Sequence, residues 1–115
     1  AMHFADNNTG YIFMAAEGMV DSTNSNASPN KFFSYHIGTD SLLRTINLPD
    51  HSAAPYNAVF TAAGTKLLTI NIIADFSQLL QGVNVAANSV TNTTDNAVLA
   101  DTLAAHIPTM FRYQQ

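Results

Sequence analysis

The chain has 115 residues and a formal net charge of −4 at pH 7, a length that suits one modest domain and is too short for two well-packed ones. Apolar residues make up 47% and charged residues only 10%, so asparagine, serine and threonine must supply the solubility. The four basic residues are scattered among eight carboxylates, which disfavours nucleic-acid binding, and no apolar run is long enough to span a bilayer.

The chain lacks cysteine, which excludes disulfides, cysteine-based zinc sites and thiol chemistry. Surfaces rich in asparagine and threonine are common on secreted and cell-surface β proteins. The first residues do not have the basic and apolar regions of a signal peptide. We therefore expect an exported protein of the periplasm or outer cell surface, whose signal sequence is absent from this chain.

The first predicted element is a strand from Tyr11 to Ala16, an apolar and aromatic run that follows the turn residues 7–10. The uninterrupted run predicts a strand buried on both faces and ended by Glu17 and Gly18. Partial burial at a strand end would raise the pKa of Glu17 by desolvation. Because Glu17 has no partner visible in the sequence, we favour a carboxylate bound to backbone or turn amides over a catalytic acid.

A second strand is predicted from Phe32 to Ile37, after residues 21–30, whose composition is that of a turn and loop. Its residues alternate, with Phe33, Tyr35 and Ile37 on one face and Phe32, Ser34 and His36 on the other. The two strands predict a hairpin with a long loop. The next segment, Leu42 to Leu48, alternates less cleanly and is predicted as a weak strand that Pro49 ends.

Two further strands are predicted, at Tyr56 to Thr61 and at Leu67 to Ile72, the second with the best alternation in the sequence. Asp75 then predicts a capped helical turn with Gln78 as the partner in a capping box and Gly82 as the stop. The apolar residues expected on one face of this turn are Phe76, Leu79 and Leu80.

The last part of the chain predicts a loop with one edge strand over residues 83–93, and then a helix from about Asp95 to Ile107. The spacing of its apolar residues predicts a buried face made of Val98, Leu99, Leu103 and Ile107. The apolar tail after Pro108 is expected to pack back on the sheet. The whole pattern predicts an all-β fold, a mostly antiparallel β-sandwich with a short helical turn and a C-terminal helix.

No nucleophile-elbow serine and no glycine-rich phosphate loop is present, so we do not expect an enzyme. The four histidines have no short-spaced pair, and a metal site would need assembly from distant segments. His3 stands beside Met2, and His36 stands in a predicted strand next to the one that holds Met14. Imidazole and thioether ligands suit copper, although for each residue a structural role is the stronger alternative.

Two segments carry a family resemblance. The string TGYIFMAAEG and, after a loop, FSYHIGTDS resemble the MbnP-like family of methanobactin-associated periplasmic proteins, in the version found in exported lipoproteins of Bacteroidetes. The elements of the family correspond here to Met2 with His3 and Phe4, to residues 10–18, and to His36 with Gly38. The stretch LLTINIIADFSQLLQG and the ending AAHIPTMF are also similar to it.

The resemblance implies an extracytoplasmic, non-enzymatic binding protein that holds copper through His36 with His3 or Met2. The modified tryptophan of copper-binding members has no counterpart, because the chain has no tryptophan. The family domain is longer, so residues 1–115 are expected to be the C-terminal portion of its sandwich, with the N-terminal half removed or present as a separate partner chain. The alternative function is a metal-free structural or interaction module of a surface lipoprotein, in a surface complex.

Overall fold

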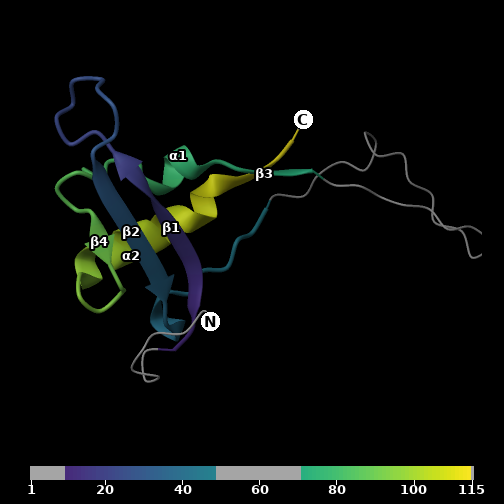
Figure 1. The fold of residues 1–115 in the computed structure, drawn as a ribbon. Coiled ribbons are helices and arrows are strands. Elements are labelled where there is room, and N and C mark those ends of the chain that lie inside the picture. The colour runs from purple at the N-terminus through teal and green to yellow at the C-terminus, as the bar shows by residue number, and fades with distance from the viewer. Residues whose placement is uncertain (1–9, 49–70, 115) are drawn as a thin grey trace, which may run out of the picture.

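A computed structural model describes residues 10–48 and 71–114 of the chain. They form a three-stranded sheet, in the order β1-β2-β4, and a two-stranded sheet of β3 and β5 (Figure 1). The elements are β1 (Ile12–Val20), β2 (Lys31–Gly38), the 3-10 helix η1 (Asp40–Leu42), β3 (Ile72–Ala74), α1 (Phe76–Leu79), β4 (Val90–Thr91), α2 (Ala97–His106), the 3-10 helix η2 (Ile107–Met110) and β5 (Phe111–Tyr113). The predicted β-rich fold with a short helical turn and a C-terminal helix is confirmed.

Several sequence predictions fall on other parts of the chain. The candidate ligands Met2 and His3, the predicted strand from Tyr56 to Thr61 and most of the strand from Leu67 to Ile72 lie outside the described residues. Within the described ranges, no helix is long and apolar enough to cross a membrane.

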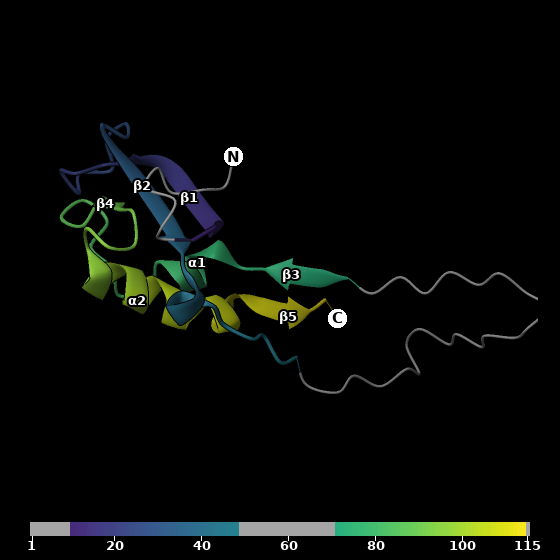
Figure 2. The same ribbon diagram turned by 90° about the horizontal axis from the view of Figure 1, so that it is seen from below.

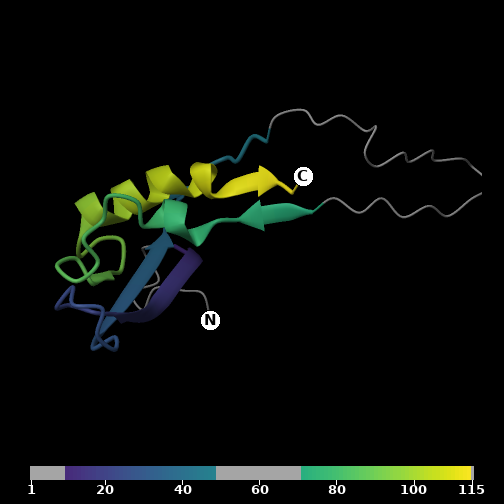
Figure 3. The same ribbon diagram turned by 90° about the horizontal axis from the view of Figure 1, so that it is seen from above.

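The first strand and the second form the predicted antiparallel hairpin around the loop 21–30. Two details of the prediction for β1 are wrong. The strand does not end at Glu17 and Gly18 but continues to Val20, and its side chains alternate between part-buried and exposed positions. The alternation follows from the layering, because the described helices cover only one face of the sheet (Figure 3). Gly18 lies under the ring of Phe33, where an added Cβ would come within 2.9 Å of Cε1.

The alternation predicted for β2 is confirmed on its covered face, where Tyr35 and Ile37 are buried. The hydroxyl of Tyr35 donates a hydrogen bond to the carbonyl oxygen of Asn88 at 2.5 Å, which ties the strand to the loop before β4. The predicted edge strand exists as β4, and it pairs with β2 in parallel. The other two strand pairs are antiparallel, so the described sheets are mostly antiparallel.

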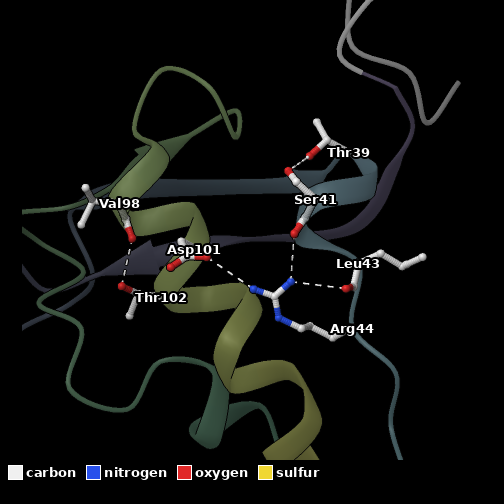
Figure 4. Close-up of polar contacts among 7 residues, drawn as sticks. All are labelled: Thr39, Ser41, Leu43, Arg44, Val98, Asp101 and Thr102. Atoms are coloured by element: carbon white, nitrogen blue, oxygen red, sulfur yellow. Dashed lines mark hydrogen bonds and ion pairs between the residues drawn. The ribbon is translucent and has the colours of Figure 1, made fainter.

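The weak strand predicted from Leu42 to Leu48 is wrong. The backbone instead turns tightly after β2, with the amide of Leu42 donating to the carbonyl of Thr39, and Leu42 enters the core as part of η1. The guanidinium of Arg44 then donates to the carbonyl oxygens of Ser41 and Leu43 and reaches the carboxylate of Asp101 on α2 (Figure 4).

The capped turn predicted at Asp75 is confirmed as α1, because the carboxylate of Asp75 accepts from the amide of Ser77 at 3.0 Å. The capping box with Gln78 is not formed. The amide of Asp75 donates instead to the carbonyl of Met110, so this end of the helix is satisfied by the segment that leads into β5.

The C-terminal helix is confirmed as α2, which begins at Ala97 and is capped by Asn96, whose side chain accepts a hydrogen bond from the amide of Leu99. Leu99 and Leu103 lie in the core, and the one error on this face is Val98, whose side chain is 81% exposed. A residue next to Leu99 in sequence is rotated about 100° around the helix axis, which turns Val98 toward solvent.

The helices α1 and α2 lie on one face of the β1-β2 hairpin, and the strands β3 and β5 extend side by side beyond them (Figures 2 and 3). The core between sheet and helices is built around Tyr35, Ile37, Leu79, Leu103 and Met110. The tail contacts the core through Met110 and Phe111, but it pairs with β3 in a second sheet and does not pack back on the first sheet as predicted. The opposite face of the hairpin, here called the outer face, has no cover among the described residues.

Candidate functional site

Three polar side chains meet on the outer face. The register of the hairpin pairs Glu17 with Ser34 and Ala15 with His36, so the side chains of Glu17, Ser34 and His36 project to the same side. The carboxylate Oε1 of Glu17 lies 2.9 Å from Nε2 of His36 and 3.1 Å from Oγ of Ser34. We refer to these three residues as the Glu17–His36 cluster.

The pKa of Glu17 differs from the sequence prediction. The hydrogen bond with His36, and then the one with Ser34, hold the pKa of the Glu17 carboxyl below its usual value. Desolvation opposes this effect but is smaller, because the side chain is 51% exposed. The predicted rise in pKa was therefore wrong, and so were the predicted amide partners, since side chains of β2 supply the donors.

The ionised carboxylate decides how the imidazole of His36 is oriented. A carboxylate only accepts hydrogen bonds, so Nε2 of His36 carries the proton that is donated to Glu17. In a neutral imidazole the unprotonated nitrogen is then Nδ1. No described residue forms a hydrogen bond with Nδ1, and the side chain is 29% exposed. In that neutral form the free lone pair of His36 lies on Nδ1.

The same geometry bears on hydrolytic chemistry, because serine, histidine and an acid occur together. In a catalytic triad the acid binds one ring nitrogen and the serine binds the other. Here Oγ of Ser34 lies 3.4 Å from Nε2, the nitrogen that already faces Glu17. Ser34 donates to Glu17, so its proton is not directed to the imidazole of His36. The arrangement does not have the geometry of a nucleophile and its general base.

The structure separates His36 from Met14. Met14 lies on the covered side of β1 and packs against the core, which agrees with its stronger sequence alternative as core filler. His106 is also removed from the outer face, since its Nδ1 lies 2.9 Å from the carbonyl oxygen of Leu79. Within residues 10–48 and 71–114 no group of three or more histidine, aspartate or glutamate side chains is placed to hold a metal. His3 and Met2 lie outside those residues.

Sequence reasoning missed the contact between Glu17 and His36. The signal lay in the hairpin itself. A hairpin that closes evenly around the loop 21–30 pairs Val20 with Lys31, which sets Glu17 opposite Ser34 and diagonal to His36. Ending the first strand at Glu17 hid this register.

The comparisons give one family. A family model described as MbnP matches residues 1–97, which is most of the chain. Neither the curated proteins nor the solved structures provide a significant match. The match spans both strands of the hairpin, the Glu17–His36 cluster and the start of α2. The chain therefore belongs to the MbnP family.

Proposed function

We propose that the protein is an extracytoplasmic, non-enzymatic binding protein that holds copper through His36, with His3 or Met2 as further ligands. The single observation that carries the proposal is the oriented imidazole of His36 on the outer face, with its Nδ1 free of described partners. Membership of the MbnP family supports an exported location in the periplasm or on the outer cell surface.

The donor set fits copper only in part. The described residues offer one imidazole nitrogen, and a soft site for copper needs further nitrogen or sulfur ligands. His3 and Met2 would supply an imidazole and a thioether. The absence of tryptophan from the chain excludes a ligand derived from that residue, so this site would differ from one that depends on a modified tryptophan.

Glu17 is assigned as a positioning residue. A carboxylate that accepts from the far nitrogen of a ligating histidine fixes the tautomer and the ring orientation and raises the basicity of the other nitrogen. The contact of 2.9 Å between Oε1 and Nε2 has this geometry. Ser34 donates to the same oxygen and restrains the carboxylate beside Nε2.

Titration with Cu(I) under a competing chelator tests the site. The wild-type chain is expected to bind one equivalent, and His36→Ala to weaken binding by at least tenfold. The matched control is His106→Gln, whose imidazole is engaged by Leu79, and it is expected to bind as the wild type does. Undiminished binding by His36→Ala would remove His36 from the site.

Glu17→Gln separates positioning from ligation. An amide places either a donor or an acceptor opposite Nε2, so the tautomer is no longer fixed, and copper affinity is expected to fall about tenfold. Nitrogen-15 NMR of the metal-free protein gives an independent measurement, with Nδ1 of His36 unprotonated in the wild type and mixed tautomers in the variant. A wild-type imidazole protonated at Nδ1 and not at Nε2 contradicts the assignment, whatever the copper result.

The second candidate function is a metal-free structural or interaction module of a surface lipoprotein. Two observations on the described residues favour it. Only one histidine of these residues lies on the outer face, and no three of their histidine, aspartate or glutamate side chains are placed to hold a metal. Metal analysis after exposure to copper separates the two functions, since a metal-free protein supports this one.

We also propose that the three-stranded sheet is one layer of a β-sandwich whose other layer covers the outer face. The outer face carries large exposed apolar side chains, which a second layer would bury: Phe13, Met19, Phe32 and Val90.

A further inference from the structure

The strand β1 ends the described three-stranded sheet. It pairs with β2 along one edge, and no described strand pairs along its other edge. The strand has nine residues, and beyond the irregularity between Ile12 and Met14 its register is regular as far as Val20. Natural edge strands are usually blunted by several charges, by proline or by a bulge. From Ala15 to Val20 this edge has a single charge, Glu17, and no proline.

A cavity lies beside this edge on the covered side of the sheet. Its volume is about 340 Å³, and it is lined by residues 15–17 of β1, by Phe33 and by Phe76, Leu79 and Leu80. The helix α1 lies close to β1 in Figures 1 and 2. Phe76 is 60% exposed although it lines the cavity, while Leu79 at the base is buried. An added strand would therefore find backbone partners at the edge and an apolar recess for its inward side chains.

The outer face beside the same edge carries one carboxylate, that of Glu17, which also contacts His36. Oε1 of Glu17 accepts both hydrogen bonds of the cluster, and no described residue forms a hydrogen bond with Oε2. A side chain that points outward from a neighbouring strand next to Glu17 is best complemented by a cation.

We propose that the edge of β1 that pairs with no described strand binds an extended segment of another polypeptide, which adds to the sheet as a strand with apolar residues facing the cavity and a basic residue facing Glu17. Backbone hydrogen bonds would give affinity, and the alternating side chains would give specificity. The inference goes beyond the proposed function and does not require copper.

A second copy that pairs through its own β1 does not provide these features. The nine residues of β1 contain no basic residue, and Glu17 is their only charged residue. Pairing two copies through this edge would leave both carboxylates without a cation. The charge of the edge therefore favours a different, basic strand.

The probe for the test is a nine-residue synthetic peptide with blocked ends. It alternates threonine with aliphatic residues, and its central outward residue is lysine. The full chain, kept metal-free with a chelator, is titrated with this peptide and with a matched peptide that has glutamate at the centre. We expect one-to-one binding of the lysine peptide, protection from amide exchange along β1, and about fivefold weaker binding of the glutamate peptide.

A pair of protein variants tests the cavity. Phe76→Ala removes an exposed ring from the recess and is expected to weaken binding about tenfold. Phe32→Ala is the matched control, because Phe32 is 53% exposed and Phe76 is 60% exposed. Phe32 lies on the outer face of β2, so its removal is expected to leave the affinity within twofold of the wild type. The thermal midpoints of both variants check that each one is folded.

Several results would overturn the proposal. The proposal is wrong if neither peptide binds, or if the lysine and glutamate peptides bind with equal affinity. It is also wrong if Phe76→Ala and Phe32→Ala change the affinity equally. Full protection of the edge amides of β1 in the free monomer would show that the chain already occupies this edge. A dimer formed through β1, detected by light scattering and abolished by Glu17→Lys, would assign the edge to a second copy.

Discussion

The carboxylate of Glu17 accepts hydrogen bonds from two side chains of β2 while half of the side chain remains exposed. Its pKa in the folded protein therefore lies below the ordinary value of 4.5. A group whose pKa is lowered by folding stabilises the folded state above its unfolded pKa. That stabilisation is lost as the pH falls through the folded pKa.

We expect the wild type to lose more stability than Glu17→Gln when the pH is lowered from 6 to 3. The glutamine variant cannot take up this proton, so its remaining loss comes from other carboxylates, such as Asp21 and Asp75, whose pKa values are also lowered by hydrogen bonds. Urea unfolding of both proteins at several pH values measures the difference. Parallel curves for the two proteins would show that Glu17 contributes nothing to the acid dependence.

Part of the candidate site could be predicted from single residues. The position of His36 in a strand and its outward direction followed from alternation alone. The contact with Glu17 required the register of two strands, which depends on where the first strand ends. An apolar run before Glu17 suggested burial, but an exposed strand face can also be apolar when nothing described covers it.

The helix α2 has two faces with very different surroundings. Leu103 has no exposed surface, whereas Val98 is 81% exposed on the opposite side. Removing buried methyl groups costs both the transfer free energy and the cavity that remains. Removing exposed methyl groups from a helix costs neither.

Leu103→Ala is expected to lower the free energy of unfolding by about 2–5 kcal/mol. Val98→Ala is the matched control, and it is expected to change stability by less than about 0.5 kcal/mol, since alanine also favours the helix. Chemical denaturation of both variants provides the measurement. A large loss in Val98→Ala would mean that this face of α2 is covered in solution.

The elements that could be predicted are those with strong local signals. The capping residue Asp75 predicts α1, and the spacing of the leucines predicts α2. The strand prediction for residues 42–48 was wrong, because the backbone forms a tight turn that buries Leu42 despite the alternation of the segment. The parallel pairing of β4 with β2 depends on contacts between distant residues and had no local signal.

At the scale of the molecule, Arg44 connects the segment that leaves the hairpin with the C-terminal helix. Its Nη2 lies 3.4 Å from Oδ1 of Asp101, and its Nη1 binds two carbonyl oxygens of its own segment (Figure 4). The side chain of Asp101 is 70% exposed, so solvent screens the pair.

A double-mutant cycle with Arg44→Ala and Asp101→Ala is expected to give a coupling of about 0.2–1 kcal/mol at low salt. The coupling should shrink as the salt concentration rises, because the pair is exposed. Arg44→Ala alone should cost more than Asp101→Ala, since it also removes the bonds to Ser41 and Leu43. A coupling insensitive to salt would contradict a surface ion pair.

The strand β2 has partners at very different distances along the chain. Ser34 meets Glu17 across the hairpin, 17 residues away, whereas Tyr35 binds the carbonyl of Asn88, 53 residues away. Closing a short loop takes much less time than forming a distant pairing. During synthesis the hairpin leaves the ribosome before β4 and α2, so the contact between Glu17 and His36 can assemble before those elements exist. The contact that positions the histidine thus depends on a shorter stretch of chain than the pairing of β2 with β4.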